Sequence, residues 1–453
     1  MTQGPAVAVI GAGIAGLAAA HDLRRAGYVP TVFEERDRVG GRIWTVRKGD
    51  FLMDLGTAVY LGTYRDAIAL INEAGLQEEF VERSAIGAIP RGDERHYLNY
   101  STPIRTALKT AVLSPRSKLV ALKLAATLIR TRKCLGYDTY EMLADIDIDT
   151  ETVREYCRRT LNEELLQYVG RPLVSGTWVH DDEDTSVALM LWTVRNMLVP
   201  NVYNLRSGVA ALPEALVAEV DVRLSHPVHN VSDTGRSVEV TYHDGKAERT
   251  EPFDACVIAT TAQPALAMFP QMDANHRSLY ETARYRRLGS ICLGLSRRPS
   301  DPATYFLVPP VEDPDTIAVV LDHNKSPGRA PDHKGLLTVL LSHEYLERSE
   351  DLDDAQVLNR AIVSAERYLG PLTDQVEEHA VVRWPEAVPT IDKGRFKLIA
   401  DFTKRVDRTA RVQMASDLDR IPGLNGALVS GREAAKRIAA AVPAQSRTAL
   451  GAR

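Results

Sequence analysis

The sequence has little of what marks a secreted, zinc-binding or nucleic-acid-binding protein. Only four of its 453 residues are cysteines, and no two of them form a CxxC pair. This excludes a disulfide framework and a cysteine zinc cluster, and it fits a reducing compartment. The formal net charge of −5 leaves no basic excess, which excludes non-specific binding to nucleic acid. No metal site is expected.

Long hydrophobic runs are also absent. Residues 1–21 and 255–272 carry no formal charge, but glycines interrupt the first stretch, and Pro264 and Pro270 interrupt the second. Neither stretch is expected to span a membrane, and the first lacks the basic n-region of a signal peptide. The sequence therefore predicts a cytoplasmic protein, with peripheral membrane attachment left open.

What the sequence does contain is enough apolar material for a large core. Hydrophobic residues make up 45% of the chain, an ordinary share for a globular protein. At roughly 150 residues per domain, the length predicts two or three folding units.

The N-terminus has the pattern of a strand, a turn, a helix and a second strand. The apolar run Ala6–Ile10 is typical of a buried parallel strand. A glycine-rich turn, residues 11–16, follows it, and a helical stretch runs to Ala26. The strand Thr31–Phe33 comes next, and Glu34 closes it.

Further elements follow from periodicity and turn signals. Residues 101–200 are mostly helical in pattern, and residues 289–343 carry four strand-like runs. The other expected helices are Asp66–Ala74, Asp354–Leu369 and Gly431–Ala441, and the other expected strands are Ser237–Tyr242, Ala255–Ala259 and Val412–Ala415. This succession predicts an α/β fold with an inserted α+β region.

The glycine-rich turn has the spacing of a dinucleotide-binding loop. Gly11 permits the tight turn, Gly13 lets the backbone approach a pyrophosphate, and Gly16 allows close packing of helix on strand. The next helix, which begins around Ile14 and Ala15, offers its N-terminus to the phosphates. A glycine-rich turn in an unrelated α/β domain is the alternative.

The acidic residue after the second strand points to the same chemistry. Glu34 falls 18 residues after Gly16, close to the position of a ribose-binding acid. Its carboxylate can accept hydrogen bonds from ribose hydroxyls and would repel a 2′-phosphate. NADP is therefore disfavoured.

The run that starts at this acid resembles the signature of the flavin-containing amine oxidase superfamily. Glu34, Glu35 and Arg36 are followed by Gly40, Gly41 and Arg42. The paired glycines let the main chain pass close to a diphosphate, and Arg42 supplies a cation beside it. An exposed charged turn is the alternative. The resemblance implies non-covalently bound FAD.

The resemblance also implies cofactor contacts elsewhere in the chain. Leu55, Gly56 and Thr57 match the segment that passes the flavin ring. Val228 stands where the family packs a valine on adenine, and Trp384 matches a residue near the flavin. Ser416, which replaces a family glycine, and Asp417 match the ribityl or phosphate end. Gly426 and Ala427 match a helix start near the pyrimidine ring of the flavin.

Together these matches predict an FAD-binding Rossmann-like domain of the GR2 type with an inserted substrate domain. The expected parts are the FAD-binding segments 1–62, 200–265 and 401–442, a mainly helical insertion facing substrate or membrane at 63–199, a mixed-sheet substrate domain at 266–400, and a flexible tail at 443–453.

Within the superfamily, the middle of the chain resembles the protoporphyrinogen oxidase branch. Val153–Pro172 and Arg383–Pro389 carry the matches, although Asn162 replaces a glycine. Amine oxidases of the family hold two aromatic side chains against the flavin. From Gly394 to Gly431 this chain has only Phe396 and Phe402, so such a cage is not expected.

One segment stands out by its charge. Residues 95–137 hold nine lysines or arginines and no acid, with apolar residues between them. The segment could contact an anionic membrane, recognise a carboxylated substrate, or form a solvated helix face.

The resemblance implies an FAD-dependent oxidoreductase. It would take a hydride from a C–H next to nitrogen, or in an activated ring, of a small organic substrate. The electron acceptor is O₂ or another molecule, and the catalytic side chains are not identified. Tyr60 either lines the substrate pocket or lies in the core. The alternatives are a flavin amine oxidase that uses O₂ and a non-catalytic binding protein resembling Rab GDP-dissociation inhibitors.

Overall fold

The computed structural model of the chain describes residues 4–56, 59–82, 86–136, 145, 148–197 and 202–444. Thr57, the end of the basic segment at Tyr137 and most of the expected tail lie outside the described residues.

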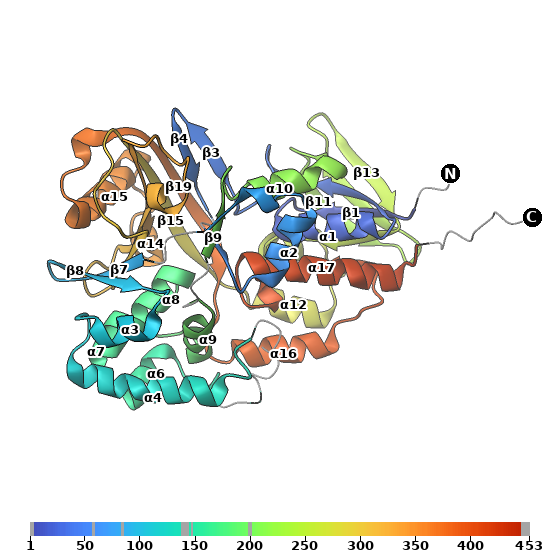
Figure 1. Cartoon of the computed structure of the whole chain (residues 1–453). Coiled ribbons are helices and arrows are strands. Elements are labelled where there is room, and N and C mark those ends of the chain that lie inside the picture. Colours follow the sequence, from blue (N-terminus) through green and yellow to red (C-terminus); the bar gives the residue numbers. More distant parts are fainter. Residues whose placement is uncertain are drawn as a thin grey trace, which may run out of the picture.

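A five-stranded parallel sheet forms the centre of one half of the molecule (Figure 1). Its strands come from the N-terminal, middle and C-terminal parts of the chain. In spatial order they are β10 (Asp221–Arg223), β2 (Val29–Phe33), β1 (Ala6–Ile10), β14 (Ala255–Ile258) and β20 (Val412–Met414). The strands β1, β2, β14 and β20 lie where the sequence predicts them, within two residues at each end.

Successive side chains of β1 point to opposite faces of the sheet and so belong to two different hydrophobic cores. Val7 and Val9 face a core shared with helices, whereas Ala8 and Ile10 face a core shared with a second sheet. That second sheet is antiparallel, β11 (Val228–Asp233), β12 (Val238–His243) and β13 (Glu248–Phe253). The parallel sheet is therefore buried on both faces, as its nearly all-apolar strands require.

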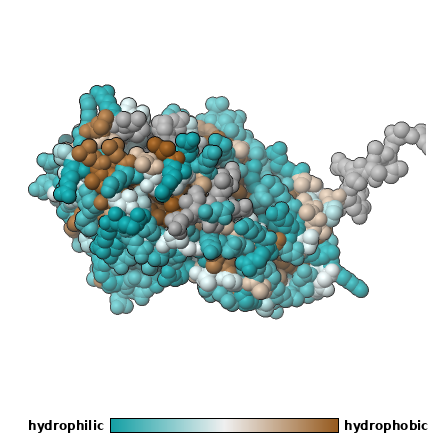
Figure 2. Space-filling model, turned by 90° about the horizontal axis from the view of Figure 1, so that it is seen from below, coloured by the Kyte–Doolittle hydropathy of each residue, from teal (hydrophilic) through white to brown (hydrophobic). Residues whose placement is uncertain are grey.

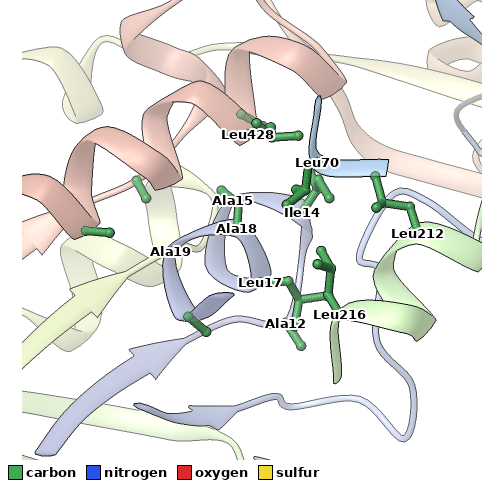
Figure 3. Close-up of a cluster of buried hydrophobic side chains, with 14 of the residues drawn as sticks. Ala12, Ile14, Ala15, Leu17, Ala18, Ala19, Leu70, Leu212, Leu216 and Leu428 are labelled. Carbon is green, nitrogen blue, oxygen red and sulfur yellow. The ribbon is translucent and has the colours of Figure 1, made fainter. Parts of the chain in front are cut away.

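The helix α1 (Ile14–Arg25) lies in the middle of the helical layer. Figure 3 shows it beside Leu428 of α17 (Leu424–Ala441), Leu70 of α2 (Arg65–Glu73), and Leu212 and Leu216 of α10 (Ala211–Leu216). A Cβ added at Gly431 would lie 2.0 Å from the Ala15 carbonyl oxygen. The glycine therefore lets α17 approach α1 closely. The periodicity placed the start of this helix seven residues late, at Gly431, whereas the helix start that the family resemblance implies at Gly426 and Ala427 lies in its first turn.

A seven-stranded sheet forms the other half of the molecule (Figure 1). Its order is β19 (Val376–Pro389), β15 (Tyr285–Leu295), β18 (Gly335–Leu341), β17 (Thr316–Leu321), β16 (Tyr305–Leu307), β7 (Ile86–Arg91) and β8 (Glu94–Asn99). The helices α14 (His343–Arg348) and α15 (Asp354–Leu369) contribute to the core on one face. The bounds predicted for α15 agree with the structure.

Both edges of this sheet were missed by the sequence analysis. At one edge, β19 contains Pro385 and Pro389, which disfavour a strand unless it lies at an edge, as this one does. At the other edge, the β7–β8 hairpin lies inside the range 63–199, which was expected to be mainly helical. It turns at Gly92, whose φ of +58° is readily reached only by glycine.

The remaining elements complete the two halves. Two small sheets pair β3 (Thr45–Lys48) with β4 (Phe51–Asp54), and β5 (Tyr60–Leu61), β9 (Val202–Leu205) and β6 (Phe80–Glu82). The other helices are α3 (Pro103–Lys109), α4 (Pro115–Thr131), α6 (Val153–Thr160), α7 (Glu163–Leu165), α8 (Arg171–Trp178), α9 (Val187–Met197), α11 (Ala262–Met268), α12 (Ala274–Glu281), α13 (Asp322–Lys325) and α16 (Arg395–Arg405). In the described part of the chain, no helix combines the length and apolarity needed to cross a membrane.

A buried histidine links the helical region to the segment that follows β19. The Nδ1 of His180 donates to the Trp178 carbonyl at 2.5 Å, and its Nε2 accepts from the Ile391 amide at 3.0 Å. Burial lowers the pKa of His180 to about 4. A proton on Nε2 would face the Ile391 N–H, so this position requires the neutral ring.

We predict a pH dependence of stability from this histidine. Between pH 6.5 and 4 the unfolded chain binds a proton at this position that the folded chain does not, so folding stability falls as the pH falls. The contribution lost is about 3 kcal/mol for a pKa difference of this size. Urea unfolding at several pH values measures it. His180→Gln should flatten the slope in this window, and the exposed His333→Gln should not. Equal slopes in all three proteins would contradict the assignment.

Candidate cofactor cleft

The glycine-rich turn lies between β1 and α1, at the carboxyl end of the parallel strands. A Cβ added at Gly11 would lie 2.6 Å from the Ala259 carbonyl oxygen, and one added at Gly16 would lie 1.9 Å from the Gly11 carbonyl oxygen. A Cβ added at Gly13 would meet no described atom within 4 Å. The outer two glycines are thus required by packing, whereas Gly13 borders open space. Ile14 and Ala15 follow as the buried first residues of α1.

The Glu34 side chain spans the start of this turn. Its Oε2 accepts from the Ala12 amide at 2.7 Å, and its Oε1 accepts from the Arg36 amide at 3.1 Å. Burial raises the pKa of Glu34, and the two backbone hydrogen bonds oppose that rise. The side chains of Glu35 and Arg36, in contrast, are exposed. The structure therefore brings Glu34 to the loop and leaves the next two residues at the surface.

The paired glycines lie directly on the turn. The Gly40 amide donates to the Ala12 carbonyl at 2.8 Å, and a Cβ at Gly41 would lie 3.3 Å from the Gly13 Cα. Positive φ angles of +96° and +58° explain why both residues are glycine.

Arg42 extends this contact to two distant segments. Its Nη1 donates to the Ala387 carbonyl at 2.9 Å, and its Nη2 donates to the Asp417 Oδ1 at 3.0 Å. Asp417 is 2% exposed, and its Oδ2 has no hydrogen-bond partner among the described residues. A buried carboxylate oxygen without a partner is costly. This oxygen therefore fits a site that a ligand hydroxyl would complete.

The residues around Asp417 lead from Ser416 to the start of α17 at Leu424. Ser416 has a φ of −156°, an extended conformation that does not need the glycine expected there. Gly426 and Ala427 lie in the first turn of α17, and the Ala427 amide already donates to the Gly423 carbonyl at 3.0 Å. Asn425, which the sequence analysis missed, is 2% exposed, and its Nδ2 has no partner among the described residues. An asparagine next to a glycine gives no sequence signal of such burial.

The segment Leu55–Gly56 is held between the two halves of the molecule. The Trp384 Nε1 donates to the Leu55 carbonyl at 2.8 Å, and the Leu55 amide donates to the Trp44 carbonyl at 2.8 Å. A Cβ at Gly56 would lie 2.0 Å from the Arg42 carbonyl oxygen. Trp384, Gly56 and Arg42 are therefore neighbours, although they are far apart in the sequence.

Two further predicted positions differ in their placement. The amides of Ser225 and His226 donate to the carbonyls of Arg36 and Glu34 at 2.9 and 2.8 Å, which places Val228 two residues from the Glu34 side of the cleft. Tyr60 is fully buried, and its hydroxyl donates to the Val209 carbonyl at 3.0 Å. Of the two alternatives for Tyr60, the structure supports the core position.

A strand–glycine turn–helix unit, a buried acid at the end of the second strand and a C-terminal segment that returns to Arg42 are the features of a dinucleotide-binding protein. Residues 14–439 match the family model described as flavin containing amine oxidoreductase. The chain therefore belongs to the flavin-containing amine oxidoreductases, and it is an FAD-dependent enzyme. This membership disfavours the alternative of a non-catalytic binding protein.

Individual proteins agree with this assignment. The chain is 21% identical to coproporphyrinogen III oxidase of Staphylococcus aureus, over 96% of this chain and 99% of that protein. A putative protoporphyrinogen oxidase from Exiguobacterium has a similar fold, with a TM-score of 0.75, 18% identity, and coverage of 96% of this chain and 98% of that one. Cyclohexylamine oxidase from Brevibacterium oxydans gives a TM-score of 0.76, 18% identity, and coverage of 96% and 99%.

Gly16 and Gly13 provide a matched pair of variants that test the proposed site. Gly16→Ala should destabilise the apoprotein by about 1–3 kcal/mol because its Cβ meets the Gly11 carbonyl. Gly13→Ala should cost less than about 1 kcal/mol, yet it should weaken FAD binding at least tenfold because its methyl group would occupy the open space. Urea unfolding and FAD titration of the apoprotein measure the two effects. Wild-type affinity in Gly13→Ala would show that the diphosphate does not pass Gly13.

Proposed function

We propose that FAD lies along this cleft, with its adenosine end at Glu34 and its flavin end at Leu55–Gly56. Each oxygen of the Glu34 carboxylate accepts one backbone hydrogen bond and keeps a second lone pair for a ribose hydroxyl. Gly13 leaves the backbone open to the diphosphate, the Gly40–Gly41 turn packs beside it, and Arg42 supplies the positive charge.

The C-terminal residues hold the other end of the cofactor. The Asp417 Oδ2 and the Asn425 Nδ2 have no hydrogen-bond partner among the described residues, so they offer one acceptor and one donor to the ribityl chain. The first turn of α17 turns the positive end of its helix dipole toward the same place. We further propose that 1–62, 200–265 and 401–442 form the FAD-binding unit, and that 63–199 and 266–400 bind the substrate.

We propose oxidation of a nitrogen-containing ring, in the manner of a porphyrinogen oxidase. Bound FAD supplies a hydride acceptor at ring nitrogen N5. The chain's part is to hold the substrate carbon there and to exclude water. The observation that carries the proposal concerns Phe396 and Phe402, the only aromatic residues between Gly394 and Gly431. They are 0% and 4% exposed and lie in two hydrophobic cores. Neither is free to form an aromatic cage for an amine.

An anaerobic substrate screen tests the proposed function. Reduced tetrapyrroles should bleach the flavin absorbance at least about tenfold faster than primary amines and polyamines, a ratio that one missing polar recognition contact can produce. Light-driven reduction of the same sample controls for a flavin that cannot be bleached. Fast bleaching by an amine, with none by a porphyrinogen, would favour the flavin amine oxidase alternative. Peroxide release on readmission of air would identify O₂ as the acceptor.

We also propose that this enzyme acts in the cytoplasm at a membrane surface, through an α3–α4 face. This face is defined by four apolar side chains that are 63–70% exposed, Leu108, Leu119, Leu122 and Ile129. Figure 2 views the side of the molecule on which α4 lies and shows apolar atoms gathered there. Exposed basic side chains surround them, among them Arg116, Lys123 and Arg130.

The exposed leucines favour the membrane over the other two readings of the basic segment. A solvated helix face would not present four large apolar side chains, and a site for a small carboxylated substrate would be concave. Arg95 does not contribute to this face, because it pairs with Asp301 at 3.1 Å. Basic and apolar side chains on one helix face suit an anionic bilayer surface.

Vesicle flotation tests the α3–α4 face. The wild type should float with phosphatidylserine-containing vesicles at low salt. It should stay in the bottom fraction when the vesicles are neutral. The triple variant Leu119→Ser, Leu122→Ser, Ile129→Ser should lower the bound fraction at least about tenfold, since it removes most of the apolar contact. The control Val311→Ser, Val363→Ser changes apolar residues that are 52% and 51% exposed elsewhere, and it should bind as the wild type does. Absence of wild-type binding at low salt would refute the proposal.

A further inference from the structure

Four charged side chains are buried next to the Leu55–Gly56 segment, centred on the preceding residue, Asp54. They are Asp54, Asp322, Lys325 and Arg329, each at most 3% exposed, and we refer to them as the buried charge cluster. Two of them are acidic and two are basic, so the cluster carries no net charge when all four are ionised.

Asp54 is the centre of the buried charge cluster. Its Oδ2 lies 3.1 Å from the Lys325 Nζ and 3.0 Å from the Arg329 Nη2. Its Oδ1 accepts from the Thr45 hydroxyl at 2.8 Å and from the Arg329 Nη1 at 3.1 Å. These cations lower the pKa of Asp54 against the opposing effect of burial. Asp54 is therefore ionised in the folded protein.

The two cations connect Asp54 to other parts of the fold. Lys325 Nζ also lies 2.5 Å from the Asp322 Oδ1, and the other oxygen of Asp322 accepts from the Thr338 hydroxyl at 2.6 Å. The Arg329 Nη2 donates to the Asn204 Oδ1 at 2.6 Å. The cluster thus joins β4 to α13 and β18 of the seven-stranded sheet, and to β9.

Stability alone does not account for such a cluster. Replacing a buried ion pair with well-packed apolar residues is often neutral or stabilising, because burying charges costs free energy. The position of the cluster in the chain suggests a reason for it. Asp54 is bonded to Leu55, and Cys292 of β15 lies with its Sγ 3.7 Å from the Asp54 carbonyl. The cluster holds the side chain of Asp54, and Trp384 holds the carbonyl of the next residue, Leu55, so both act on one short backbone segment.

We propose that Asp54, Lys325 and Arg329 are positioning residues that fix the Leu55–Gly56 backbone against the flavin ring and, through their balanced charges, set its reduction potential. This inference rests on the proposed placement of FAD in the cleft. In a dry site, a charge acts over a longer range than it does in water. Loss of a negative charge should therefore favour the electron-rich reduced flavin, and loss of a positive charge should disfavour it.

The test is a comparison of reduction potentials in FAD-loaded variants. Asp54→Asn should raise the reduced-to-oxidised ratio at a given potential at least threefold, and Lys325→Met should lower it at least threefold. For a two-electron couple, a threefold change corresponds to about 14 mV. The double variant Asp54→Asn, Lys325→Met restores the balance of charge and should return to the wild-type potential.

A matched control separates this effect from loss of stability. Asp182 is 2% exposed and lies 2.6 Å from the Arg154 Nε and 2.9 Å from the Arg171 Nε, in the helical region. Asp182→Asn should lower the thermal midpoint as Asp54→Asn does, and it should leave the flavin potential unchanged.

Thr45→Val provides a milder change should a single charge variant fail to fold. It removes one hydrogen bond that disperses the negative charge of Asp54. It should therefore lower the reduced-to-oxidised ratio, as Lys325→Met does, but by a smaller amount.

The outcomes distinguish this inference from the proposed function. Opposite shifts in the two charge variants, with none in Asp182→Asn, support the inference. Unchanged potentials in all variants, or shifts of the same sign in Asp54→Asn and Lys325→Met, overturn it while leaving FAD binding intact. A wild-type protein that takes up no FAD overturns the proposed function instead.

Discussion

The ion pair between Arg42 and Asp417 connects two parts of the chain that are 375 positions apart. Asp417 is almost fully buried, so its charge has to be compensated from within the protein. Arg42 can provide that compensation only if the Gly40–Gly41 turn lies on the glycine-rich loop and the start of α17 lies beside it. The pair therefore requires the N-terminal and C-terminal segments to assemble into one cleft.

The residues proposed to hold FAD come from both of the large sheets. The loop and Glu34 belong to the five-stranded sheet, whereas Trp384 belongs to β19 of the seven-stranded sheet. Leu55 bridges them because its amide and carbonyl are held by different tryptophans, Trp44 and Trp384. A ligand that spans both sheets would therefore contact a Leu55 backbone that hydrogen bonds fix at both its amide and its carbonyl. Such rigid support holds a reactive group in place.

The elements that the sequence predicted correctly are those specified by residues close together in the chain. The glycine spacing and the apolar runs fix the strand–turn–helix unit, and the helix Asp354–Leu369 begins at a capping box formed by Asp353 and Gln356. The family resemblance extended the prediction to the C-terminal cleft residues. Edge strands were missed because β19 contains prolines and because the β7–β8 hairpin lies in a stretch dominated by helical patterns.

The buried charges could not be found in this way. Lys325 and Arg329 lie in a polar stretch that is typical of an exposed loop, and their partner Asp54 is 271 and 275 positions away. Burial of a charge depends on where its partner folds, and a single sequence does not contain that information. The same holds for Asn425, whose side chain accepts from the Ala67 amide of α2 at 3.1 Å.

The central claim is that segments from both ends of the chain hold one dinucleotide along its length. Hydrogen exchange of the apoprotein, measured with and without FAD, tests this claim most directly. FAD should slow exchange together at the turn 11–16, at 34–42, at 54–56 and at 416–427. Slowing confined to the N-terminal turn, with no change at 416–427, would contradict the claim.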